Sequence, residues 1–92
     1  SVLTPELAFR LGLGAARWLQ TTGLPMRAVM GRDTRRSGPM LGAAVAAGLA
    51  SGGVSVTTLG YAPTPAVSFL ARTEGYGLGV VISASHNPAP DN

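Results

Sequence analysis

The stretch LGAAVAAGLASGGVSVTTL, residues 41–59, decides the fold class of this chain. Apolar or small residues recur in it at i, i+3, i+4, i+7 and i+8, the spacing of one buried helix face: Leu41, Ala44, Val45, Gly48 and Leu49. Gly52 and Gly53 end this helix, because glycine is a poor helix former. Residues 54–59 are rich in β-branched side chains and predict a strand. A helix that leads directly into a strand is typical of an α/β domain.

Two similar helix–strand units flank this stretch. Before it, Thr4 and Pro5 predict a helix start, since threonine caps a free N–H group and proline suits the first helical position. Residues 27–30 then predict a strand. After it, residues 64–65 repeat the cap and the proline, and the apolar residues 78–82 predict a strand covered on both faces. Strands that alternate with helices favour a layered domain with a mainly parallel sheet.

The first and third predicted helices each carry an apolar stripe that we expect to face the core. In the first helix this stripe has helical spacing and would bury the tryptophan: Leu7, Leu11, Ala15 and Trp18. In the third helix the stripe consists of Val67, Leu70 and Ala71. Both helices would therefore pack against the sheet through these side chains.

The composition excludes several classes of protein. A hydrophobic fraction of 46% with 12% charged residues is the opposite of a disordered chain. No apolar run approaches the roughly 20 residues that cross a bilayer, and the first residues lack the basic region and apolar core of a signal peptide. The absence of cysteine excludes disulfides and thiolate metal ligands. We therefore expect no membrane partner and a cytoplasmic location.

The basic charge is concentrated in one place. The formal net charge is +3, and three of the arginines fall together at Arg32, Arg35 and Arg36. Nucleic-acid binding would need a longer basic stripe with interleaved aromatic residues, whereas aromatics make up only 5% of the chain. We therefore expect no nucleic-acid partner, and we interpret the cluster either as a local anion site or as a solvated rim.

Two polar loops follow predicted strands, residues 31–37 after the first and residues 83–92 after the last. Parallel strands would place both loops at one edge of the sheet, and ligands of such sheets bind beyond the carboxyl ends of the strands. Tyr61 follows the middle strand, where it could line this edge or cover it, and we interpret it as structural. The edge is therefore the expected functional site.

The last loop contains residue types with chemical use. The hydroxyl of Ser85 can accept and donate a phosphoryl group, and such covalent catalysis splits one hard transfer into two easier ones. His86 can carry charge near a phosphate, while Ser83 and Asn87 can bond nearby backbone and shape the loop. The residue types alone leave a second interpretation open, namely a helix cap followed by a surface histidine.

Two blocks of sequence resemble those of the α-D-phosphohexomutase family. Residues 83–88, Ser-Ala-Ser-His-Asn-Pro, resemble its active-site signature, in which Thr or Ser and a small residue precede Ser-His-Asn-Pro. Residues 31–38, Gly-Arg-Asp-Thr-Arg-Arg-Ser-Gly, resemble a second block of the family. Weaker landmarks at residues 3–6, 59–60 and 64–66 follow in family order, so the resemblance covers almost the whole chain.

The resemblance implies a fold and a reaction. The fold is a three-layer α/β/α domain with a mixed, mainly parallel sheet, the first of several domains. The reaction is a phosphoryl transfer between a phosphorylated Ser85 and a hexosamine phosphate, through a sugar bisphosphate. The form with Ser83 and Ala84 is most similar to the phosphoglucosamine mutase group, which interconverts glucosamine 6-phosphate and glucosamine 1-phosphate. The resemblance also implies Mg²⁺ at the phosphoryl oxygen on Ser85, and it allows a homodimer.

The implied site residues fall into two groups. Ser85 and His86 are the catalytic candidates, and the substrate or phosphate loop comprises Arg32, Arg35, Ser83 and Asn87. Asp33 offers another interpretation of the arginines, because it could cap the turn and pair with one of them at the surface.

The family's opening strand, metal loop, sugar-selecting loop and terminal phosphate-binding domain have no counterpart in the sequence. We therefore expect residues 1–92 to be an incomplete N-terminal domain that is inactive alone. Two alternatives stay open. One is a glucose- or mannose-phosphate mutase of the same family, and the other is a non-catalytic anion-binding module.

Overall fold

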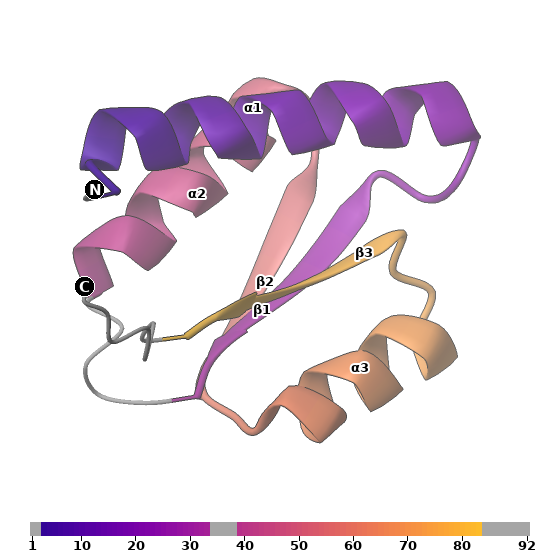
Figure 1. The fold of residues 1–92 in the computed structure, drawn as a ribbon. Helices are drawn as coiled ribbons and strands as arrows, with labels where there is room; N and C mark the ends of the chain where they lie inside the picture. The colour runs from indigo at the N-terminus through magenta and orange to yellow at the C-terminus, as the bar shows by residue number, and fades with distance from the viewer. Residues whose placement is uncertain (1–2, 34–38, 84–92) are drawn as a thin grey trace.

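The structure is a computed structural model that describes residues 3–33 and 39–83 of the chain. Helices and strands alternate along it (Figure 1) in the order α1 (Pro5–Thr22), β1 (Arg27–Arg32), α2 (Pro39–Ser51), β2 (Ser55–Tyr61), α3 (Thr64–Thr73) and β3 (Leu78–Ile82). The predicted sequence of elements is thus confirmed. The strand predicted at residues 27–30 runs on to Arg32, so Gly31 and Arg32 belong to the sheet and not to the polar turn.

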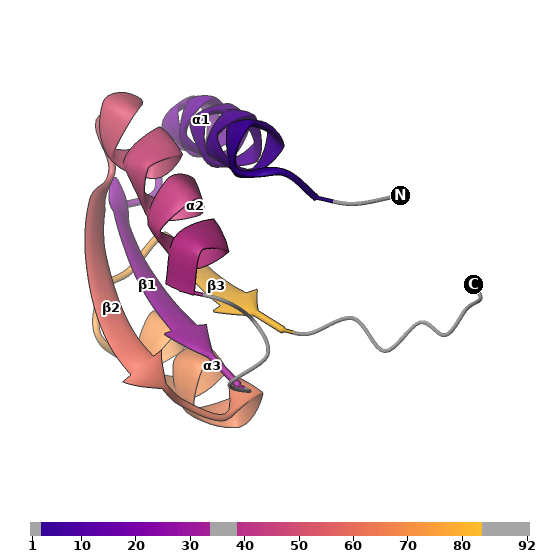
Figure 2. The ribbon, with the colours of Figure 1, turned by 90° about the vertical axis from the view of Figure 1, so that its left-hand side faces the viewer.

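The three strands form one parallel sheet in the order β2-β1-β3. Helices α1 and α2 cover one face and α3 covers the other (Figure 1; Figure 2 shows the layers from the side). Successive side chains of β1 point to opposite faces of the sheet, as strand geometry requires. Ala28 and Met30 join the cluster beneath α1 and α2, whereas a Cβ on Gly31 would lie 2.8 Å from Val67 of α3. The predicted α/β/α domain is therefore confirmed.

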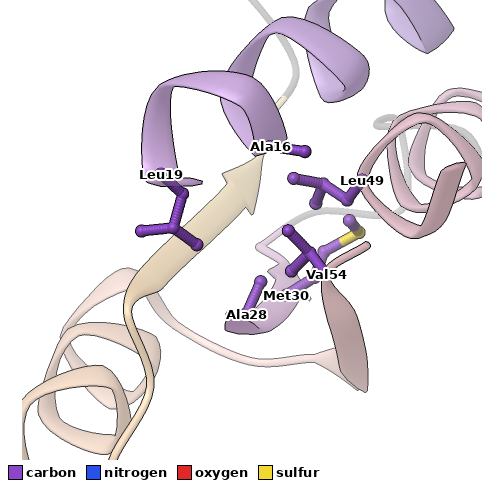
Figure 3. Close-up of a cluster of buried hydrophobic side chains, with 6 residues drawn as sticks. All are labelled: Ala16, Leu19, Ala28, Met30, Leu49 and Val54. Carbon is purple, nitrogen blue, oxygen red and sulfur yellow. The ribbon is translucent and has the colours of Figure 1, made fainter. Parts of the chain in front are cut away.

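The core beneath α1 and α2 combines side chains from both helices and from the sheet. Figure 3 shows its members: Ala16, Leu19, Ala28, Met30, Leu49 and Val54, all at most 3% exposed. Several are small, which lets the helices approach the sheet closely. Because β1 has a strand on each side and a helix layer on each face, its middle residues are the most completely buried of the three strands.

The apolar stripe predicted for the buried face of α1 is wrong at three of its four residues, and only Ala15 packs against the core. Leu7, Leu11 and Trp18 are 48%, 57% and 55% exposed, so the tryptophan does not lie in the core. The buried face lies about a third of a turn away and consists of three small residues and one leucine: Ala8, Gly12, Ala16 and Leu19. Small residues are needed there because α1 crosses α2 at backbone contact, with Gly12 against Gly48 and Val45. The predicted stripe of α2 is confirmed, since its five residues are buried or half-buried.

Both ends of α1 are capped, and Thr4 is the cap that the sequence predicts. The Leu7 N–H donates to Thr4 Oγ1 at 3.1 Å, and Pro5 follows as the first helical residue. At the other end Gly23 adopts the left-handed conformation with φ 77°, which glycine reaches without strain. The threonine therefore satisfies one of the N–H groups that a helix start leaves without a partner.

Replacing Thr4 with alanine is expected to weaken the first turn of α1 by about 1 kcal/mol, because the capping acceptor is lost. Hydrogen–deuterium exchange of the first-turn amides should accelerate about fivefold. Thr21→Ala is the matched control, since the Thr21 hydroxyl donates to the Trp18 carbonyl and caps no N–H group. Equal acceleration of these amides in both variants would contradict the capping role.

Two expectations for the second half of the chain need correction. Thr64 does not cap α3, because the cap position is Pro63, no side chain caps the helix there, and Thr64 is its first residue. Strand β3 has a helix layer on each face, as predicted, but it is only partly buried. The reason is its place at the sheet edge, where one flank has no neighbouring strand within the described residues. The inner face of α3 is confirmed, with Val67 fully buried.

Across residues 3–33 and 39–83, no helix has the combination of length and apolar character that crossing a bilayer requires.

Candidate functional site

The carboxyl ends of the three strands meet at one edge of the sheet. Arg32 is in register with Ile82 on one side and with Tyr61 on the other. Two hydrogen bonds tie the following residues together: Asp33 N–H donates to the Ile82 carbonyl at 3.2 Å, and Ala62 N–H donates to the Arg32 carbonyl at 2.8 Å. The loops that follow β1 and β3 therefore start side by side, as the parallel sheet predicts.

Arg32 lies at the centre of this edge. Its guanidinium carbon is 4.6 Å from the centre of the Tyr61 ring, within the range of a cation–π contact. Its stem passes over α2, where a Cβ on Gly42 would lie 3.9 Å from the Arg32 Cδ. Within the described residues, no carboxylate lies within ion-pair distance of Arg32 and no carbonyl or hydroxyl accepts its N–H groups. A half-buried guanidinium in this state is suited to bind an anion.

The predicted pairing of Asp33 with an arginine is not present between Asp33 and Arg32. Asp33 is exposed, and its backbone N–H joins β1 to β3. Among the described residues, the carboxylate at this edge therefore does not neutralise Arg32. Arg35 and Arg36 lie outside the described residues.

A hollow of about 240 Å³ lies beside Arg32, between the first turns of α2 and the carboxyl ends of β1 and β2. Its wall is mostly apolar, and small residues of α2 leave the space open: Gly42, Ala43 and Ala46. Arg32 supplies the charged part of the wall. The hollow could therefore hold the uncharged part of a ligand whose anionic group contacts the guanidinium.

The structure places part of the predicted site. Ser83 is exposed and directly follows β3, so the loop with the Ser-Ala-Ser-His-Asn-Pro sequence leaves the sheet next to the Arg32–Ile82 pair. The other predicted site residues lie outside the described residues: Arg35, Ser85, His86 and Asn87. The structure thus brings Arg32 and the start of the serine loop together, while the positions of these other side chains stay predictions.

Sequence reasoning did not predict the contact between Tyr61 and Arg32. We interpreted Tyr61 as structural, and the structure adds that its ring lies against the guanidinium of Arg32 and that the residue is 57% exposed. The available signal was its place directly after Gly60 at the carboxyl end of a strand, because a glycine within a strand often marks a bulge.

The described residues do not provide a magnesium site. Mg²⁺ prefers oxygen ligands, and one or two carboxylates usually hold it in proteins. No group of three or more histidine, cysteine or acidic side chains gathers among residues 3–33 and 39–83. Ser85, the ligand expected in this chain, is outside those ranges. Magnesium therefore stays a prediction.

Comparison with known proteins identifies the family. The model of the phosphoglucomutase/phosphomannomutase α/β/α domain I matches residues 1–92 of the chain. The chain belongs to the phosphoglucomutase/phosphomannomutase family. The observed layers agree with that description, because helices cover both faces of the sheet.

Several relatives within this family are phosphoglucosamine mutases. The chain is 57% identical to the enzyme of Moorella thermoacetica and 54% identical to that of Desulforamulus reducens, each over 90 residues. It is 56% identical over 92 residues to the enzyme of Mycobacterium tuberculosis. Each match covers 98% of this chain and 20% of the relative. The chain thus spans about a fifth of the length of these curated relatives.

Proposed function

We propose that a full-length version of this protein interconverts glucosamine 6-phosphate and glucosamine 1-phosphate through a phosphoserine at Ser85. The observation that carries the proposal is the carboxyl edge of the sheet, where the serine loop starts beside a guanidinium without a carboxylate partner among the described residues. The identity of 54–57% to phosphoglucosamine mutases supports the choice of sugar.

The proposed reaction consists of two phosphoryl transfers. A hydroxyl of the sugar monophosphate attacks the phosphorus on Ser85, the bond from Ser85 Oγ to phosphorus breaks, and a sugar bisphosphate forms. The bisphosphate then turns over, and Ser85 Oγ attacks the other phosphorus, so that the second phosphoryl group returns to the serine and the isomeric monophosphate leaves. In each transfer the proton of the attacking hydroxyl ends on the oxygen that leaves the phosphorus, so Ser85 Oγ is protonated after the first transfer and a sugar hydroxyl after the second, and the net reaction is an isomerisation.

Charge neutralisation is the main task of the protein in such a reaction. The transition state spreads negative charge over the equatorial oxygens of the phosphoryl group, and a phosphoserine carries nearly two negative charges at neutral pH. Arg32 lies where it could offset this charge, and we propose the same for Arg35 and for a protonated His86. Magnesium would take its carboxylate ligands from parts of the polypeptide outside this chain.

The test is mass spectrometry of a full-length version purified from its own cells, followed by kinetics. We expect a phosphoryl group on Ser85 and a kcat/KM for glucosamine 6-phosphate at least about tenfold above those for glucose and mannose phosphates, a difference of about 1.4 kcal/mol. A phosphoryl group on Ser83 instead would mean that the nucleophile is misplaced.

The alternative within the family is a mutase of glucose or mannose phosphates. The family description is compatible with it, since it names phosphoglucomutase and phosphomannomutase. The same kinetic comparison decides between the two, because a preference for glucose or mannose phosphate would replace the proposed sugar and leave the role of Ser85 unchanged. The cytoplasmic location and the homodimer stay predictions.

A further inference from the structure

We infer that Tyr61 is a positioning residue, which holds the guanidinium of Arg32 at the carboxyl edge of the sheet so that it binds a phosphoryl group. This inference rests on the proposed function, because it names a device that serves the same site. It goes beyond that function in assigning roles to Tyr61 and to the bulge in β2.

The first step of the argument is the register between β1 and β2. Residues 27–30 of β1 pair in order with residues 55–58 of β2, so that regular pairing would place Arg32 opposite Gly60. The observed partner of Arg32 is Tyr61, which means that β2 contains one extra residue before this point. Gly60 lies within this irregularity and has φ 74°, a left-handed conformation that other residues rarely adopt.

The extra residue changes the face on which Tyr61 lies. Side chains alternate between the two faces of a strand, so a shift of one residue moves a side chain to the opposite face. Without the bulge Tyr61 would be out of phase with Arg32. With it, the two are register partners and the ring lies 4.6 Å from the guanidinium carbon. The bulge therefore creates the contact, in agreement with the tendency of bulges to re-aim side chains next to active sites.

The second step concerns what the contact does to Arg32. An arginine side chain is long and loses rotamer freedom when it binds a ligand. The Tyr61 ring contacts the guanidinium of Arg32. The N–H donors of Arg32 lie in the guanidinium plane, so they can remain available to an anion. Tyr61 therefore reduces the freedom of the guanidinium before an anion arrives.

The third step identifies the ligand class. No carboxylate pairs with Arg32 among the described residues, and this guanidinium is only half-exposed. Arginine donors match the oxygens of a phosphoryl group in geometry and charge. The adjacent loop starts at Ser83, two residues before the predicted phosphoserine. The phosphoryl group could thus belong to the phosphoserine or to the incoming sugar phosphate, and the kinetic test separates these sources.

The experiment compares Tyr61→Leu and Tyr61→Phe in a full-length version. Phenylalanine keeps the ring, so its kcat/KM should stay within about twofold of the wild type, whereas leucine should lower it about fivefold, the worth of an exposed cation–π contact. A higher KM would assign the phosphoryl group to the substrate. A lower kcat at constant KM would assign it to the phosphoserine. Phe69→Leu is the matched control, because Phe69 is 56% exposed on α3, and we expect no change.

A double-mutant cycle distinguishes positioning from general structural support. If Tyr61 acts through Arg32, then Tyr61→Leu has no further effect in an Arg32→Ala background. If the losses of kcat/KM in the two single variants multiply in the double variant, the inference is overturned. Equal losses in Tyr61→Phe and Tyr61→Leu would also overturn it, and so would wild-type kinetics in Tyr61→Leu.

A readout without turnover keeps the inference separate from the proposed function. Calorimetric binding of inorganic phosphate to the unphosphorylated full-length version should weaken in Arg32→Ala and Tyr61→Leu and persist in Tyr61→Phe. If the wild-type protein shows this binding pattern but no mutase activity, only the proposed function is overturned, and the role of Tyr61 is still supported. Phosphate binding that is unchanged in both Arg32→Ala and Tyr61→Leu would overturn the role of Tyr61.

Discussion

Replacing Ser85 with alanine in a full-length version is expected to remove nearly all mutase activity while the fold stays intact. Alanine has no oxygen to form the phosphoryl ester, so the two-step transfer loses its covalent intermediate. We expect kcat to fall by about a thousandfold or more, which corresponds to about 4 kcal/mol of lost transition-state stabilisation. Ser85 follows the last strand by three residues and is not one of the residues that form the described core. Steady-state kinetics with the sugar phosphate is the measurement.

Two other serines calibrate this result. Ser51 is exposed at the end of α2, at the opposite edge of the sheet, so Ser51→Ala should keep wild-type activity. Ser83 directly follows β3 and shapes the loop in our interpretation, so Ser83→Ala should lower activity much less than Ser85→Ala. Activity of Ser85→Ala close to the wild type would refute the nucleophile assignment, and a thousandfold loss in Ser83→Ala alone would transfer the role to Ser83.

The order of elements was predictable because strong local signals mark their ends. Gly53 and Gly75 have positive φ angles in the turns before β2 and β3, where few other residues would be tolerated. Parallel pairing follows from the alternation of helices and strands, since such strands need crossover connections. The sheet edge that carries the candidate site follows in turn, because parallel strands end on the same side.

The buried face of α1 was not predictable from the size of its apolar residues. Two faces compete in this helix, one with Leu7, Leu11 and Trp18 and one with small residues around Gly12. Burial of large side chains normally contributes more, since the gain scales with apolar area. Here the close crossing of α2 selects the small residues, and that crossing depends on contacts about 35 residues apart in sequence.

The contact between Arg32 and Tyr61 could not be predicted from the sequence alone either. Its cause is the extra residue of β2, and a bulge becomes visible only when the two strands are paired. Gly60 alone indicates a turn as readily as a bulge. The motif residues could therefore be proposed from the sequence, whereas the residue that orients one of them required the structure.

The glycine at the helix crossing gives the largest expected effect on stability. A Cβ on Gly12 would overlap the Val45 carbonyl oxygen and lie 3.0 Å from the Leu49 nitrogen, both backbone atoms of α2. Backbone cannot rotate away as a flexible side chain can, so Gly12→Ala must push the helices apart. We expect a loss of about 1–3 kcal/mol despite the better helix propensity of alanine. Hydrogen–deuterium exchange of α1 and α2 in a full-length version should accelerate about fivefold or more.

Gly14→Ala is the matched control on the same helix. Apart from the adjoining backbone of α1, no described atom lies within 4 Å of a Cβ at Gly14, which is exposed, so only the helix propensity changes. Alanine should therefore stabilise α1 by about 0.5–1 kcal/mol and slow its exchange. The same substitution two residues apart is thus expected to act with opposite sign. Equal stabilisation at both positions would show that the helices do not cross at backbone contact, and the packing that selects the buried face of α1 would need revision.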